Sequence, residues 1–139
     1  MKTTRRASCS CGDLRLDVTG DPYATVLCHC TACQRRTGSA FGVGVYFNAA
    51  DVTISGATTP YDRQVENRVF RSFFCPRCGT SVYWRTDLHP QGIGIGLGCF
   101  TDPAAFRPDR SVWESRKLEW FDIDGIPGHI EGGRSASTR

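Results

Sequence analysis

The chain has 139 residues, of which 40% are hydrophobic and 22% are charged, and its formal net charge at pH 7 is +3. These values are typical of one soluble globular domain, and the small, dispersed positive charge argues against a nucleic-acid-binding protein. No apolar run approaches the roughly 18 residues that a membrane-spanning helix requires, which argues against a membrane partner. The basic N-terminal segment is not followed by the apolar core of a signal peptide. We therefore expect a cytoplasmic protein with reduced cysteines.

In chain order, short strand patterns alternate with turn residues. Leu14, Leu16 and Val18 alternate with polar residues, which predicts a half-buried strand. Segments rich in β-branched and aromatic residues predict further strands at 25–28, 43–47, 52–54, 69–74 and 80–85. Short helical turns are expected at 31–37, ended by Gly38, and at 102–106, and a last strand is expected to begin at Val112 and Trp113.

This pattern predicts a mainly β fold of short antiparallel strands with one or two short helices. A single zinc-stabilised domain is expected over residues 1–131, followed by a disordered tail at 132–139 that has no apolar residue larger than alanine. In the strand at 80–85, alternation places Val82 and Trp84 on one face and Tyr83 and Arg85 on the other, and one of these faces is expected to be core.

Seven of the eight cysteines fall in three clusters, and in a reducing compartment such clusters first indicate metal ligands. A Cys-x-x-Cys turn directs both sulfurs at one ion, and residues i and i+2 of an extended segment point to the same side. A Cys-x-x-Cys cluster therefore needs two further ligands, which a Cys-x-Cys cluster can supply. The spacing predicts a closed structural zinc site formed by Cys9, Cys11, Cys75 and Cys78.

The remaining cluster is Cys28-His29-Cys30-Thr-Ala-Cys33. Its three cysteines can reach one ion and leave a fourth position open, which is typical of a catalytic or exchangeable zinc, so we expect two zinc ions per chain. His29 lies between the ligands and is expected to point away from the metal. In one alternative, Cys99 closes the second site and both zinc ions are structural; in another, the triplet is redox-active and binds no metal.

Three thiolates make a soft zinc centre that suits a further sulfur ligand. A substrate thiol bound there would become a reactive nucleophile, and its addition to a small aldehyde, or the reverse C–S cleavage, follows from this chemistry. Arg35 and Arg36 follow the triplet and are either a carboxylate-binding pair or a solvated surface pair.

The segment GIGIGLGCF has glycines at 92, 94, 96 and 98. This period of two differs from the Gly-x-Gly-x-x-Gly of dinucleotide-binding proteins and predicts a strand with one nearly bare face. Such a face either packs tightly inside the β-core or forms the floor of a pocket.

In this order, the segments CSCGDLRLDVTGDP, LCHCTACQRRTGSAF, FFCPRCGTSVYWRTD, LGCFTDPAAFRPD and SVWESRKLEWF resemble the glutathione-dependent formaldehyde-activating enzyme family. That family also includes centromere protein V, and the resemblance covers about residues 8–130. It implies a β-tent fold, a structural zinc at Cys9, Cys11, Cys75 and Cys78, and a catalytic zinc at Cys28, Cys30 and Cys33. The implied activity is condensation of formaldehyde with glutathione to S-hydroxymethylglutathione, which is carbon–sulfur lyase chemistry.

The leading interpretation is a zinc-dependent carbon–sulfur lyase-like enzyme that acts on thiol–aldehyde adducts, with glutathione as one candidate thiol. Two alternatives remain: a non-catalytic zinc module that binds protein or nucleic acid, and a protein that handles thiols or metal by exchanging zinc. A triplet presented in a concave pocket favours the enzyme, whereas a triplet closed off from solvent favours the binding module.

Overall fold

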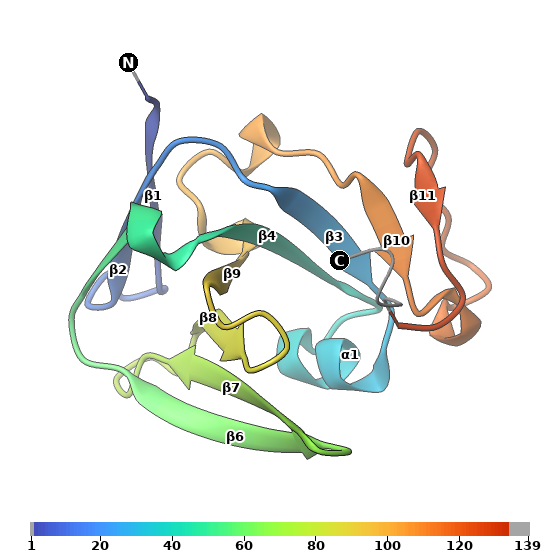
Figure 1. The fold of residues 1–139 in the computed structure, drawn as a ribbon, viewed down its shortest axis with the longest axis horizontal. Helices are drawn as coiled ribbons and strands as arrows, with labels where there is room; N and C mark the ends of the chain where they lie inside the picture. Colours follow the sequence, from blue (N-terminus) through green and yellow to red (C-terminus); the bar gives the residue numbers. More distant parts are fainter. Residues whose placement is uncertain (1, 134–139) are drawn as a thin grey trace.

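The computed structural model describes residues 2–133, which form two β-sheets (Figure 1). The smaller sheet is antiparallel and has the order β1-β2-β5, with β1 at Thr4–Ser8, β2 at Arg15–Thr19 and β5 at Val52–Ser55. The predicted mainly β fold is confirmed.

The larger sheet has eight strands in the order β11-β10-β3-β4-β9-β8-β7-β6. Its pairs are antiparallel except where β10 pairs with β3 and β11. The strands are β3 (Ala24–Cys28), β4 (Gly42–Asn48), β6 (Thr59–Val65), β7 (Arg68–Phe74), β8 (Ser81–Thr86), β9 (Gly92–Gly96), β10 (Arg110–Val112) and β11 (Gly128–His129). The α-helix of the described chain is α1 (Thr31–Thr37), and short 3-10 turns occupy Ala49–Asp51, Leu97–Cys99, Pro103–Ala105 and Glu114–Arg116.

The main core lies between the two sheets. Leu14, just before β2, and Leu16 and Val18 of that strand pack with the inner face of the large sheet, where Val45 and Phe47 of β4 are fully buried. A smaller cluster covers the opposite face of the large sheet and includes Ala24, Val26 and Val112, with Cys28 and Tyr46 packed against it. The alternation of β3 therefore turns Cys28 away from the main core and toward the outer face.

Glycines on β4 and β9 leave the middle of this outer face without side chains. Gly94 pairs with Tyr46 on one side and with Trp84 on the other. A Cβ atom at Gly94 would overlap the Trp84 indole, and one at Gly44 would lie 2.7 Å from Trp84 Cζ2. The glycines thus let the indole lie directly against the sheet, where its Nε1–H donates to the Tyr46 hydroxyl at 3.1 Å.

Several expected elements are present, and one is wrong. The helix expected at 31–37 is α1, and Gly38 ends it in the left-handed conformation at φ 66°. The strand expected to begin at Val112 instead ends there, because Trp113 adopts φ 56° and turns the chain away from the sheet. Of the predicted tail, Gly132 accepts a hydrogen bond from the Trp113 backbone N–H at 2.9 Å, whereas residues 134–139 lie outside the described residues.

In the strand expected at 80–85, Val82 was expected to share a face with Trp84, but Val82 packs in the main core together with Tyr83, whereas Trp84 lies against the outer face. Val82 and Tyr83 are both buried, and so is Trp84, whereas Arg85 is exposed. The physical reason is an irregular register between β7 and β8, because Tyr83 pairs with Phe73 and Ser81 pairs with Phe74, which leaves Val82 as an extra residue.

The close contact between Gly94 and Trp84 predicts a large difference between two glycine substitutions. Gly94→Ala should lower the free energy of unfolding by about 1–3 kcal/mol, because the added methyl group must displace the indole. Gly98→Ala is the control, since no atom lies within 4 Å of its added Cβ, and it should change stability by less than about 0.5 kcal/mol. Urea unfolding measures both, and equal stabilities would mean that the indole moves aside without cost.

Candidate functional site

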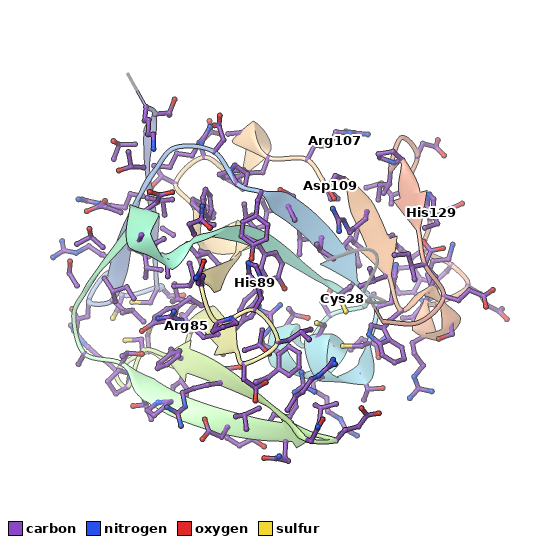
Figure 2. The ribbon with its side chains drawn as sticks, in the orientation of Figure 1. Cys28, Arg85, His89, Arg107, Asp109 and His129 are labelled. Carbon is purple, nitrogen blue, oxygen red and sulfur yellow. The ribbon has the colours of Figure 1, made fainter. Side chains whose placement is uncertain are left out.

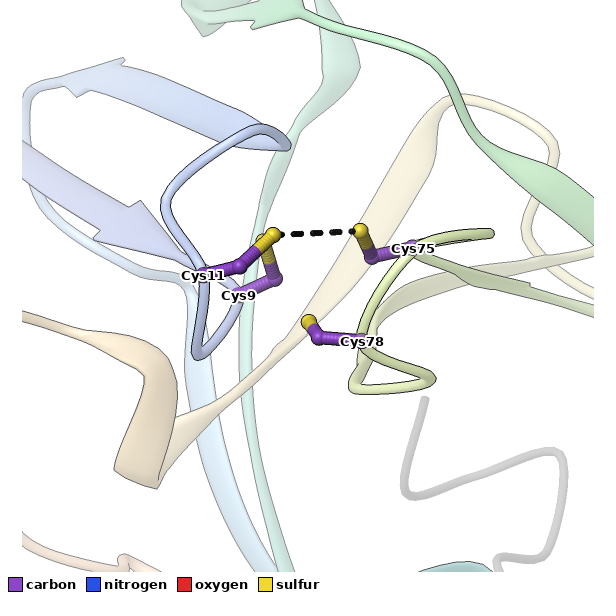
Figure 3. A group of neighbouring side chains, drawn as sticks. All are labelled: Cys9, Cys11, Cys75 and Cys78. Atoms are coloured by element: carbon purple, nitrogen blue, oxygen red, sulfur yellow. Dashed lines mark hydrogen bonds between the residues drawn. The ribbon is translucent and has the colours of Figure 1, made fainter.

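One group of four cysteines joins two turns that are distant in the sequence. Cys9 and Cys11 follow β1, and Cys75 and Cys78 lie between β7 and β8, with all four side chains directed toward one another (Figure 3). The Sγ atoms of Cys9 and Cys11 are 3.6 Å apart, and those of Cys11 and Cys75 are 3.7 Å apart. A tetrahedral zinc with four bonds of about 2.3 Å separates its sulfurs by about 3.8 Å, whereas a disulfide requires about 2.05 Å. The spacing therefore fits a metal and not a disulfide.

The local backbone explains how each cysteine pair converges. Gly12 and Gly79 directly follow the second cysteine of each pair and adopt φ +86° and φ +78°, a conformation that glycine accepts without strain. The Thr80 hydroxyl lies 3.2 Å from Cys78 Sγ, and hydrogen bonds from its side chain and backbone lower the pKa of Cys78 to about 5. A cysteine with this pKa is available as a thiolate ligand at neutral pH.

The second group consists of the three cysteines of the triplet. Cys28 ends β3, Cys30 is the N-cap of α1, and Cys33 lies in the first turn of that helix. Their Sγ atoms lie within 4.8 Å of one another, and all three residues are half-buried. Figure 2 shows Cys28 at the junction of β3 and α1.

The three thiols of the triplet control one another's ionisation. Contacts with the Cys28 and Cys33 side chains lower the pKa of Cys30 to about 2, and the contact with Cys30 raises the pKa of Cys28. The backbone N–H of Cys33 also donates to Cys30 Sγ at 3.4 Å. One thiolate is thus favoured at the expense of its neighbours, and three thiolates this close together require a cation between them.

His29 and Cys99, the other candidates for this group, belong to neither cysteine group. His29 is buried, packs against Phe41 and Phe121, and places its Nε2 atom 3.0 Å from Ser111 Oγ. The Cys99 thiol instead lies 3.8 Å from a backbone carbonyl oxygen of β8, in the turn that follows β9.

A pocket of about 400 Å³ lies beside the triplet and reaches toward the four-cysteine group. Its walls include Arg36 and Gly42 on one side and Thr80, Gly96 and Cys99 on the other. The triplet cysteines are not among the lining residues of this pocket, but their neighbours Arg36 and Gly42 are. A Cβ atom at Gly42 would lie 3.4 Å from Cys33 Cβ and 2.5 Å from Arg36 Nη2, so the pocket wall at Gly42 and Arg36 adjoins Cys33.

Both interpretations of the glycine-rich strand apply, at different positions. Gly94 packs tightly against the Trp84 indole, whereas Gly96 lines the pocket. Arg36 lies over Trp84, with Cζ 4.4 Å from the ring centroid, and no pattern in the sequence indicates this contact. The adjacent Arg35 is exposed, so the two arginines have different surroundings.

Residues 4–116, which contain both cysteine groups, match the model of a family described as glutathione-dependent formaldehyde-activating enzyme. The chain belongs to this family. Among solved structures, a crystal structure of a Rhodobacter sphaeroides protein is similar to this member of the formaldehyde-activating family, with a TM-score of 0.54 and 20% identity over 68% of this chain and 85% of that chain. That likeness concerns the fold alone. No curated protein matches the chain significantly. No helix in residues 2–133 is long and apolar enough to span a membrane.

A hydrogen-bonded series connects the triplet strand of this family member to its last strands. His29 Nε2 contacts the Ser111 hydroxyl, which also hydrogen-bonds Glu114, and Glu114 Oε2 lies 2.7 Å from His129 Nδ1. The Ser111 hydroxyl donates to the carboxylate, so His29 Nε2 must carry the hydrogen that donates to Ser111. His29 is therefore fixed by β10 and not by the metal group.

The Glu114–His129 pair predicts a pH-dependent contribution to stability. Its hydrogen bond to Glu114 raises the pKa of His129 above the ordinary 6.5. Burial acts to raise the pKa of Glu114, but hydrogen bonds from His129 and Ser111 outweigh burial and hold it below the ordinary 4.5. The contribution of His129 is lost as pH rises through its raised pKa, and that of Glu114 is lost as pH falls through its lowered pKa, so the pair stabilises most between about pH 4.5 and 6.5.

His129→Gln should therefore destabilise the protein more at pH 5.5 than at pH 9, where the neutral imidazole no longer pairs with the carboxylate. Lys117 also faces this pair and opposes the charge of His129, so it is kept in all variants. Urea midpoints of wild type and variant at each pH give the difference, and a difference that does not change with pH contradicts the ion pair.

Proposed function

We propose that the chain is a zinc-dependent carbon–sulfur lyase-like enzyme that joins a small thiol, such as glutathione, to formaldehyde or a similar small aldehyde. The observation that carries this proposal is the convergence of three half-buried cysteine sulfurs beside a pocket of about 400 Å³. A module that only binds macromolecules has no need of such a pocket. Family membership supports glutathione and formaldehyde as the class of substrates.

The proposal includes two zinc ions with different roles. Cys9, Cys11, Cys75 and Cys78 would form a closed structural site, and the sulfur spacing near 3.7 Å supports this assignment. Cys28, Cys30 and Cys33 would hold the catalytic ion and leave one position open. None of the eight cysteines forms a disulfide, which supports a location in the reducing cytoplasm.

A zinc ion in the triplet would lower the pKa of a substrate thiol and hold its sulfur in position for attack. In the forward reaction the sulfur forms a bond to the aldehyde carbon, the carbonyl π bond breaks, and the thiol proton ends on the carbonyl oxygen. The product is a hydroxymethyl thioether, and the reverse reaction returns thiol and aldehyde. No oxidant or further reactant is needed. The chain's own contribution is to converge three soft ligands and to exclude a fourth protein ligand.

Zinc content distinguishes the two sites. Wild type should contain two zinc ions, and the Cys28→Ser/Cys30→Ser/Cys33→Ser variant should contain one and keep its fold, because the triplet lies outside the main core. Cys75→Ser should instead lose the fold, because its group ties together segments 64 residues apart. Native mass spectrometry and circular dichroism test both. One zinc in wild type and in the triplet variant would mean that the triplet is empty, and an exchange or redox role would then be favoured.

The lyase activity can be tested by NMR exchange spectroscopy between formaldehyde and S-hydroxymethylglutathione. Wild type should accelerate this exchange above the spontaneous rate. Cys30→Ser should lower the enzymatic rate by at least about 100-fold, because metal-assisted charge stabilisation is worth several kcal/mol. Arg35→Ala is the control and should stay close to wild type, because Arg35 is exposed and does not line the pocket. A wild type that holds two zinc ions and gives no acceleration would favour the binding-module alternative.

A further inference from the structure

Among the described residues that line the pocket, Arg36 is the only one with a charged side chain. The remaining walls consist of glycines, small polar residues, the Cys99 thiol and apolar side chains, with no carboxylate among them. Arg36 forms no ion pair with any acidic residue among residues 2–133, so no carboxylate of the described chain occupies its guanidinium. A pocket of about 400 Å³ lies within the range of roughly 300–1,000 Å³ found for small-molecule sites.

The guanidinium is held in place by two surfaces. Its Cζ atom lies 4.4 Å from the centroid of the Trp84 ring, and the bare backbone of Gly42 faces Nη2 so closely that a Cβ atom there would lie 2.5 Å away. Trp84 is itself fixed by Gly94 beneath it and by its hydrogen bond to Tyr46. Stacking of a guanidinium on an aromatic face leaves the N–H donors in its plane available for an anion.

Arg36 also lies close to the triplet. A Cβ atom at Gly42 would lie 2.5 Å from Arg36 Nη2 and 3.4 Å from Cys33 Cβ, so the guanidinium and this cysteine adjoin the same glycine. Cys30, Cys33 and Arg36 follow one another at intervals of three along α1, which places them on the same side of the helix. A small ligand whose sulfur binds at the triplet can therefore also reach the guanidinium of Arg36 with another of its groups.

We propose that Arg36 binds a carboxylate of the substrate thiol through a bidentate ion pair and so selects acidic thiols over neutral ones of similar size. An arginine that is stacked, preorganised and unpaired matches the planar geometry of a carboxylate. Arg35, its exposed neighbour, has no such role. The selection of a substrate rests on the proposed function, whereas the anion preference of the pocket does not.

The selection is tested with mercaptoacetate and 2-mercaptoethanol, two thiols of similar size of which only the first is an anion. Arg36→Ala should raise KM for mercaptoacetate by about 10- to 100-fold, as expected for loss of hydrogen bonds to a charged group, and should change KM for 2-mercaptoethanol by less than about threefold. Arg36→Lys keeps the positive charge but loses the paired N–H donors of the planar guanidinium, so KM for mercaptoacetate should rise by an intermediate factor. Arg35→Ala should change neither value by more than about twofold. Equal effects on both thiols, or equal effects of the Arg35 and Arg36 variants, overturn the proposal.

A second measurement does not depend on activity. S-methylglutathione has two carboxylates and no free thiol, so isothermal titration calorimetry with it reports the pocket alone. It should bind wild type and Arg35→Ala with similar Kd and bind Arg36→Ala about 10- to 100-fold more weakly, with circular dichroism confirming that each variant is folded. Binding that depends on Arg36, in a protein that converts no thiol–aldehyde adduct, would keep the anion site and reject the lyase. No binding to wild type, or equal binding to the folded Arg36→Ala, would overturn the anion site itself.

Discussion

The contact of the Trp84 indole with the bare backbone of β4 and β9 is the interaction on which the site depends. An indole can lie this close to a sheet only where the neighbouring residues lack a Cβ atom, and Gly44 and Gly94 supply that absence. The indole then provides the face on which Arg36 rests. These glycines thus hold the Trp84 indole in place, and the indole in turn holds the charged guanidinium of Arg36 beside the triplet.

The four-cysteine group contributes to the pocket as well as to the fold. Its turn between β7 and β8 continues into Gly79 and Thr80, which line the pocket. Thr80 also joins the two turns directly, because its hydroxyl oxygen lies 3.0 Å from Ser10 Oγ and accepts a hydrogen bond from the Ser10 backbone N–H at 3.1 Å. A local shift of the turn that carries Cys75 and Cys78 would therefore displace one wall of the pocket.

Local spacing was sufficient to predict which cysteines converge, because i, i+2 pairs and Cys-x-x-Cys turns fix the direction of a sulfur within a few residues. The helix that carries Cys33 was also predicted from a local signal, because Gly38 marks its end. The stacking of Arg36 on Trp84 could not be predicted, because it depends on the register of three strands that are distant in the sequence.

The sequence did not predict the strands β1 and β6 or the turn at Trp113, and the cause is similar. The polar edge strands β1 and β6 have no hydrophobic alternation that distinguishes them from loops, and only pairing with their neighbours makes them strands. Trp113 follows a valine in a segment that looks extended, yet it adopts a left-handed conformation that no glycine or asparagine announces.

Helix α1 shows how a short segment can combine two functions. Its seven residues carry Cys33 in the first turn and Arg36 in the last, and its N-cap is Cys30. A metal ligand and an anion-binding group on one rigid turn cannot move independently, so the distance between a bound sulfur and a bound carboxylate would be set by the helix and not by loops. Trp84, on which the guanidinium of Arg36 rests, is itself held by the sheet. Selectivity for an acidic thiol would thus follow from the rigidity of the β-scaffold.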